Sequence, residues 1–161
     1  MNNLKFYQIS ANYINFLSFY APHLFHNRNS SQKHDRKYIG IILNINNMDY
    51  FAPLSSFKIK HNKMKEKLDF IKIKNYAVIN LNCMFPVPAT EYKYVDFSQE
   101  KDISYQKLLL AEYRYVKSIQ NKIKTNAKSL YKLKTKGSET PLTKRCNDFL
   151  LLEKMCNKYT L

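Results

Sequence analysis

The hydrophobic pattern of the chain changes period near Ser104, and this change restricts the folds that the sequence can adopt. Before Ser104, short apolar stretches alternate with polar residues or run together, as β-strands do. After it, apolar residues recur at steps of mainly three, four or seven, which is typical of one face of a long helix or of a pair of helices. The sequence therefore predicts an α+β fold, in which helices pack on a twisted, mostly antiparallel sheet.

A hairpin is the clearest local prediction within the sheet. Asn46 and Asn47 can form a tight turn between the second and third predicted strands, because asparagine tolerates turn geometry. Ser10 is expected to cap a short helix that reaches about Tyr20. A long polar loop is predicted to follow at residues 22–37. The predicted strands are residues 4–9, 38–45, 48–54, 70–73, 77–88 and 92–97.

The boundaries of the later helices are predicted from breaking and capping residues. Asn126 is expected to interrupt the long helical stretch, and Gly137 to end it, since glycine suits the position just past a helix. A last helix is predicted after it, capped by Thr140 or Thr143. With 161 residues and only two glycines and five prolines, the whole chain 1–161 is predicted to be one domain.

The charge balance indicates an anionic partner. The sequence has 27 lysines and arginines against 12 acids, a formal net charge of +15, and only four of the cations are arginines. Lysines behave as point charges that suit phosphate contacts, and the 13 tyrosines and ten phenylalanines offer rings on which unpaired bases can stack. Any single lysine or ring is more simply a surface or core residue, but their sum favours nucleic acid.

Cysteines and hydropathy indicate the compartment. Cys83, Cys146 and Cys156 form no C-x-x-C pair and no zinc-type spacing, which suits a reduced intracellular setting. Neither a signal peptide nor a run of 18 apolar residues is present. We therefore expect a soluble, cytoplasmic protein. Adsorption to an anionic membrane is a lesser alternative, because the basic residues are spread over both halves of the chain.

The stretch PLSSFKIKH, residues 53–61, is the candidate site for phosphate chemistry. Ser55 and Ser56 offer two hydroxyls, and Lys58 offers a positive charge directly after them. The simpler interpretation is a solvated turn capped by the serines. Further basic residues follow that could bind RNA: Lys60, His61, Lys63 and Lys65.

RNA can be cut with such groups because its 2′-hydroxyl attacks the adjacent phosphorus and leaves a 2′,3′-cyclic phosphate. The protein must move protons, align the attack and stabilise the charge on the phosphate oxygens. Histidine can act as an acid or a base, and crowding by other cations can lower the pKa of a lysine toward a value useful for catalysis. The sequence lacks a glycine-rich phosphate loop, an H-E-x-x-H motif and a dense acidic cluster. A metal-dependent nuclease is therefore disfavoured, and no metal or other cofactor is expected.

Five stretches follow in order along roughly residues 4–158: KFYQISANYINFL, KYIGIIL, YFAPLSSFKIKHN, VINLNCMFPVP and CNDFLLLEKM. Together they resemble the ToxN/AbiQ toxins of type III toxin–antitoxin systems. The resemblance implies a compact, highly twisted, Kid/MazF-like sheet or barrel with surrounding helices. It also implies a metal-independent endoribonuclease that acts on cellular or phage RNA in abortive infection. A small, repeated, pseudoknot antitoxin RNA would be processed by the toxin, would inhibit it and would form closed protein–RNA assemblies with it.

Carried onto matching positions, the resemblance implies that Tyr13, Ser55, Ser56 and Lys58 are catalytic. A basic residue, Arg36 or Lys37, would complete the pocket, and the sequence leaves open which of the two points inward. Tyr13 is equally well explained by packing between helix and sheet. A non-catalytic RNA-binding module, whose serines and lysines only grip phosphate, is the alternative function.

Overall fold

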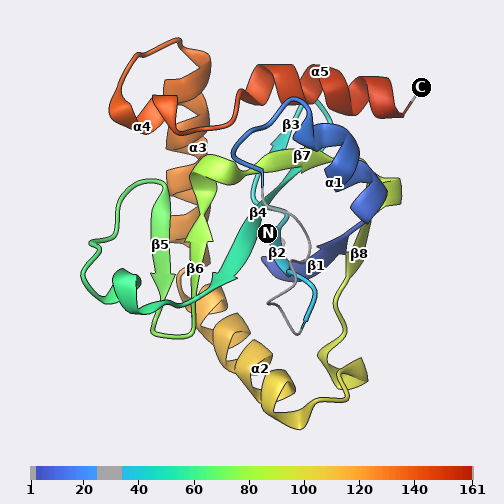
Figure 1. Ribbon diagram of the computed structural model, residues 1–161, viewed down its shortest axis with the longest axis vertical. Coiled ribbons are helices and arrows are strands. Elements are labelled where there is room, and N and C mark those ends of the chain that lie inside the picture. Colours follow the sequence, from blue (N-terminus) through green and yellow to red (C-terminus); the bar gives the residue numbers. More distant parts are fainter. Residues whose placement is uncertain (1–2, 25–33, 161) are drawn as a thin grey trace.

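Eight strands form one antiparallel sheet within residues 3–24 and 34–160, the part of the chain that this computed structural model describes (Figure 1). The strand order is β5-β6-β4-β2-β1-β8, and β3 and β7 also pair with β4. Helices pack around the sheet, so the prediction of an α+β fold is confirmed. The strands are β1 (Lys5–Ile9), β2 (Tyr38–Gly40), β3 (Asn44–Ile45), β4 (Met48–Ser56), β5 (Phe70–Ile73), β6 (Ala77–Asn80), β7 (Phe85–Val87) and β8 (Tyr92–Tyr94).

Strand β4 is the centre of the sheet because four strands pair with it. In the predicted hairpin, β3 pairs with the start of β4 and β2 pairs with its middle. Strands β6 and β7 pair with β4 as well. Asn46 and Asn47 have φ angles of 53° and 63°, the left-handed geometry that a two-residue hairpin turn requires. The hairpin is therefore confirmed, although the predicted strand 38–45 is interrupted between Gly40 and Asn44.

Further element boundaries differ from the predictions within the sheet and the central helices. Residues 77–88 form two strands and not one, because a 3₁₀ turn at Leu81–Cys83 redirects the chain so that β7 pairs with β4. The long helical stretch breaks at Ile119 and not at Asn126. The peptide N–H of Ile119 still bonds to the carbonyl groups of Tyr115 and Val116, so the two helices are nearly continuous.

The helices bury two apolar clusters. α2 (Ile103–Ser118) and α3 (Gln120–Thr135) pack with β1, β5 and β6 in one cluster. α1 (Ala11–Ser18) and α5 (Phe149–Tyr159) pack against β4 and β7 in the other. Ser10 caps α1 as predicted, since its hydroxyl accepts a hydrogen bond from the Tyr13 N–H.

The predicted last helix is two helices. Thr140 caps the short α4 (Pro141–Lys144), and Asp148 caps α5. Gly137 ends α3 at a φ of 83°, as its identity predicts. None of the described helices is long and apolar enough to cross a membrane.

Candidate functional site

The two candidate serines are the last residues of β4. On one side of this strand, the pairing with β2 reaches only Pro53, and the Leu54 N–H donates to the Lys37 carbonyl at 3.0 Å. On the other side, the pairing with β6 continues to Ser56. The serines therefore lie at the end of a central strand, where one of its edges becomes open, and not on an edge strand.

Strand geometry separates the two serine hydroxyls. Successive side chains of a strand point to opposite faces, so Ser55 and Ser56 do not form a pair of hydroxyls on one face. Ser55 is half-buried and Ser56 is exposed. Backbone groups also alternate between the two edges of a strand. The Ser56 N–H is therefore directed to the same open edge as the N–H of Leu54.

Arg36 lies at this open edge and contacts Ser55. Its Nη1 atom donates to Ser55 Oγ at 3.0 Å and to the Leu54 carbonyl oxygen at 3.2 Å. Burial lowers the pKa of the guanidinium, but arginine side chains stay protonated in proteins at neutral pH. A permanent positive charge therefore touches a hydroxyl at the end of the central strand.

Lys37 points away from Arg36, as the alternation of an extended chain requires. Its Nζ atom donates to the Asp35 carbonyl at 3.1 Å and lies 5.4 Å from the centre of the Tyr105 ring. The side chain is buried beside Glu112 of α2. Of the two candidates, only Arg36 contacts Ser55, whereas Lys37 is enclosed in the protein.

The buried Glu112 carboxyl makes the stability of the fold depend on pH. Burial raises the pKa of the Glu112 carboxyl from 4.5 to about 8, and Lys37 partly opposes the rise. The folded state therefore keeps a proton that the unfolded state releases, so stability falls as the pH rises between these values. We expect the free energy of unfolding to decrease by about 2 kcal/mol between about pH 5.5 and 7.5.

Thermal unfolding across that pH range measures this effect. The Glu112→Gln variant removes the titrating group and keeps its shape, so its melting temperature should change much less with pH. A wild-type melting temperature that stays level or rises across the range would contradict the assignment.

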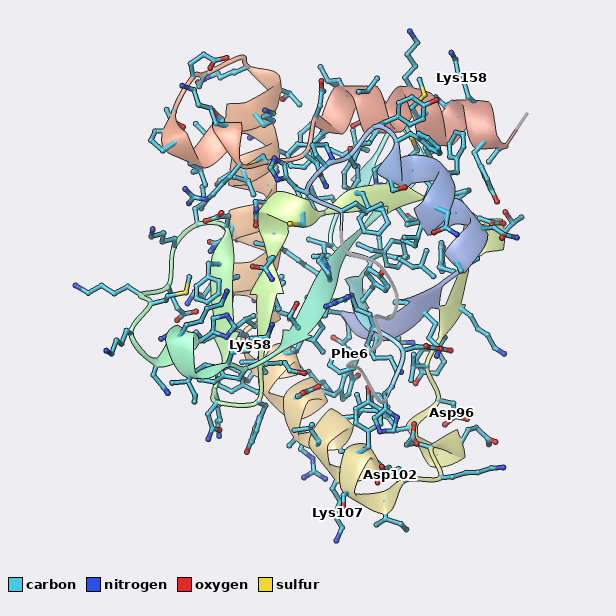
Figure 2. All side chains as sticks on the ribbon, viewed as in Figure 1. Phe6, Lys58, Asp96, Asp102, Lys107 and Lys158 are labelled. Atoms are coloured by element: carbon cyan, nitrogen blue, oxygen red, sulfur yellow. The ribbon has the colours of Figure 1, made fainter. Side chains whose placement is uncertain are left out.

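Lys58 starts a 3₁₀ turn, Ile59–Asn62, directly after the serine pair. Its side chain is exposed, and Figure 2 shows it well away from Lys158. The backbone N–H of Lys58 donates to His61 Nδ1 at 2.8 Å. The position of Lys58 beside Ser56 is thus fixed by a hydrogen bond within the turn.

His61 is buried and not a solvated loop residue. Its ring packs against Phe57 and Phe70, with centroid distances of 5.4 and 5.6 Å. Burial, with Lys60, Lys58 and Lys72 as lesser causes, lowers its pKa. Because Nδ1 accepts the Lys58 N–H, the proton of the neutral ring is on Nε2. His61 therefore supports the turn, while the lysines around it are the exposed residues: Lys60, Lys63 and Lys65.

Tyr13 is fully buried in the cluster between α1 and α5. Its hydroxyl donates to the Pro86 carbonyl at 2.6 Å, and its ring lies 5.0 Å from that of Tyr159. Burial raises the pKa of this hydroxyl, so it stays protonated at neutral pH. These contacts connect Tyr13 to β7 and α5, and they do not bring it to the serines at the end of β4.

A pocket of about 380 Å³ joins Arg36 to the start of the Tyr13 helix. Ser10, Tyr92 and Lys93 line it together with Arg36. The sequence predicted Ser10 only as a helix cap and residues 92–97 only as a strand, and neither was predicted to line a pocket. The alternation of Tyr92 and Tyr94 could have indicated that one of these rings faces such a pocket. No group of three His, Cys, Asp or Glu side chains that could hold a metal ion occurs among the described residues.

Residues 5–157 match the family described as "Toxin ToxN, type III toxin-antitoxin system". The chain belongs to the ToxN toxin family. It is 30% identical to Endoribonuclease ToxN from Bacillus thuringiensis subsp. kurstaki, over 98% of this chain and 85% of that protein. The match covers almost the whole chain and confirms the resemblance in the sequence.

Two solved structures share the ToxN-family fold described above. One concerns selective toxin inhibition by a non-coding RNA pseudoknot in bacterial type III toxin–antitoxin systems. Its TM-score is 0.84 at 28% identity, over 99% of both chains. The other concerns a bacterial antiviral system that a processed non-coding RNA regulates. Its TM-score is 0.86 at 26% identity, over 96% of this chain and 98% of that chain.

Proposed function

We propose that this protein is an endoribonuclease toxin that cuts RNA without a metal ion. The observation that carries the proposal is the contact between the Arg36 guanidinium and the Ser55 hydroxyl at the open end of β4. Family membership and the name of its relative, an endoribonuclease, support the activity. The basic surface of a chain with a net charge of +15 supports RNA as the substrate.

The reaction needs no nucleophile from the protein. The 2′-oxygen of the ribose forms a bond to the adjacent phosphorus, and the bond from phosphorus to the 5′-oxygen breaks. One proton leaves the 2′-hydroxyl and one reaches the 5′-oxygen, so the products are a 2′,3′-cyclic phosphate and a 5′-hydroxyl.

The protein residues stabilise the charge that grows on the phosphate. Arg36 and the Ser55 hydroxyl bind one non-bridging oxygen, and the Ser56 N–H is directed to the same open edge. Lys58 and the Ser56 hydroxyl approach the phosphate from the other face of the strand end. Neither Tyr13 nor His61 accepts the first proton, because Tyr13 is protonated and His61 Nδ1 already accepts a hydrogen bond.

An RNA antitoxin is the proposed partner. A relative of the same fold is inhibited by a non-coding RNA pseudoknot, and another belongs to an antiviral system. We propose that a small, repeated, pseudoknot RNA covers the exposed lysines after β4 and forms a closed assembly with the protein. Release of the toxin would then expose cellular or phage RNA in the cytoplasm to cleavage, as in abortive infection.

Cleavage in the presence of a chelator tests the proposal. Purified, antitoxin-free protein should cut RNA in excess EDTA and leave cyclic phosphate ends, which mass spectrometry identifies. The same RNA with 2′-deoxy sugars should bind equally well and remain intact, because the attacking oxygen is missing. Intact RNA under conditions of proven binding would instead support a non-catalytic RNA-binding module, and cleavage that stops in EDTA would contradict metal independence.

A further inference from the structure

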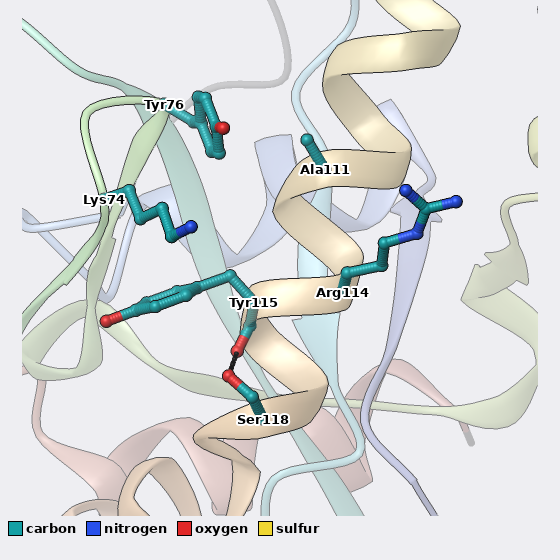
Figure 3. Close-up of a pocket in the computed structure, with 6 residues that line it drawn as sticks. All are labelled: Lys74, Tyr76, Ala111, Arg114, Tyr115 and Ser118. Carbon is teal, nitrogen blue, oxygen red and sulfur yellow. Dashed lines mark hydrogen bonds between the residues drawn. The ribbon is translucent and has the colours of Figure 1, made fainter.

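A second pocket lies between the β5–β6 turn and α2, in a region that the chemistry above does not use (Figure 3). Its volume is about 350 Å³, which is at the small end of the range for sites that bind small molecules. Six residues line it: Lys74, Tyr76, Ala111, Arg114, Tyr115 and Ser118. None of these six is acidic, so the pocket has a positive charge from its two cations.

Two aromatic rings are held in place inside this pocket. Tyr76 and Tyr115 are half-buried and pack against the cluster beneath α2 and α3. The Lys74 ammonium lies 5.6 Å from the centre of the Tyr115 ring, and Figure 3 shows it between the two tyrosines. An aromatic surface beside positive charge is the combination that proteins use to hold a base and its phosphate.

Lys74 occupies a backbone position that is unusual for lysine. Its φ is 50°, in the left-handed region that favours glycine or asparagine. Ser118 uses its hydroxyl proton in a 2.6 Å hydrogen bond to the Tyr115 carbonyl, so its oxygen is left as an acceptor. A ribose hydroxyl or a base amino group can donate to that oxygen.

The pocket adjoins the end of β4. Ser56 pairs directly with Ala77, and the Phe57 N–H donates to the Tyr76 carbonyl at 3.3 Å. Neighbouring strands lie about 4.8 Å apart, so Tyr76 is one strand away from the residues that follow the serine pair. A single-stranded RNA at the end of β4 is therefore within reach of this pocket.

We propose that this pocket binds one nucleotide of single-stranded RNA, with its base against Tyr76 and Tyr115, one phosphate at Lys74 and the adjoining phosphate at Arg114, whose guanidinium Figure 3 shows on the other side of α2 from Lys74. The proposal rests on RNA being the ligand of this protein, and it adds a subsite that recognises a base near the cleaved bond. A folded duplex does not fit, because the space holds about one nucleotide.

Binding of a non-cleavable probe separates this subsite from the cleavage reaction. The probe is a fluorescein-labelled 12-nucleotide 2′-O-methyl adenosine strand, whose blocked 2′-oxygen cannot attack. The Lys74→Asn/Arg114→Gln double variant should bind it about tenfold more weakly at physiological salt. The slope of log affinity against log salt should fall by about 1.4, since each lost phosphate contact on a single strand contributes about 0.7.

A charge-matched variant provides the control. Lys154→Gln/Lys158→Gln removes the same charge from exposed positions on α5, and Figure 2 shows Lys158 at the far end of the molecule from α2. This control should retain wild-type affinity to within about twofold. Asparagine at position 74 tolerates the left-handed backbone, so the pocket variant should keep its melting temperature.

The ring contribution is tested at Tyr115. Tyr115→Leu should weaken binding by about tenfold, whereas Tyr115→Phe should retain it, because stacking needs the ring and not the hydroxyl. Equal affinity and salt slope in the pocket and control double variants would overturn the subsite, as would a wild-type protein that does not bind the probe. Binding through the pocket by a protein that cuts no RNA would instead refute only the proposed nuclease activity.

Discussion

The Arg36→Gln variant should cut RNA about a thousandfold more slowly than the wild-type protein. Its guanidinium donates to Ser55 Oγ at 3.0 Å, so it is held at the position where the proposed reaction develops negative charge on the phosphate. Removal of one such pre-positioned donor typically costs about a hundredfold to a thousandfold in rate, and here a full positive charge is lost as well. Single-turnover cleavage of an RNA substrate at saturating protein measures the effect on the chemical step.

Controls for Arg36 must separate catalysis from binding and from charge. Arg36→Lys keeps the charge but loses the planar fork, so it should recover only part of the rate. Lys158→Gln removes a cation from the exposed face of α5 and should retain the wild-type rate. If Arg36→Gln cleaves within about threefold of the wild type while it binds and folds normally, Arg36 does not belong to the active site.

Ser55→Ala offers an independent measure of the same contact. The hydroxyl is half-buried and accepts from Arg36, so its loss removes both a phosphate donor and the group that positions the guanidinium. If the two groups act together on one oxygen, the effects of Arg36→Gln and Ser55→Ala should not add in the double variant.

Local sequence signals were sufficient for the hairpin and for several caps. Asn46 and Asn47 predict the turn because few residues accept its left-handed geometry, and Gly137 ends α3 for the same reason. Ser10 predicts the start of α1 through its own side-chain chemistry. In each case the deciding interaction lies within a few residues of the sequence.

Features that depend on distant contacts were not predictable. The division of residues 77–88 follows from the separate pairing of β6 and β7 with β4, and no local pattern encodes it. No local pattern marked the break at Ile119 either. Glu112 looks like an exposed helical residue in the sequence, yet it is buried beside Lys37. Such burial is decided by the elements that the fold brings together.

The candidate site likewise combines features that the local sequence predicts with features that depend on distant contacts. Alternation predicts that Arg36 and Lys37 point in opposite directions, but only the pairing of Lys37 with Leu54 decides which of them meets Ser55. His61 is one of several polar residues in its segment, and its burial follows from the rings of Phe57 and Phe70. The roles of Tyr13, Ser55, Ser56 and Lys58 in catalysis, and that of Arg36 beside Ser55, remain predictions.

The Arg145→Met variant should lose about 3 kcal/mol of stability, or roughly 10 °C of melting temperature. Asp69 is buried directly before β5, and its carboxylate accepts two hydrogen bonds from Arg145, at 2.6 and 2.8 Å. Methionine fills the space but leaves that carboxylate buried without its partner, which is costly.

Denaturation of three variants distinguishes the loss of the ion pair from a general sensitivity of this segment. Lys144→Met changes an exposed cation next to Arg145 and should alter stability by less than about 0.5 kcal/mol. Asp69→Leu/Arg145→Met removes both charges and should recover most of the loss, because no buried charge is then left alone. A double variant that is less stable than Arg145→Met would show that the pair stabilises the fold through its own hydrogen bonds and not only by avoiding an isolated charge.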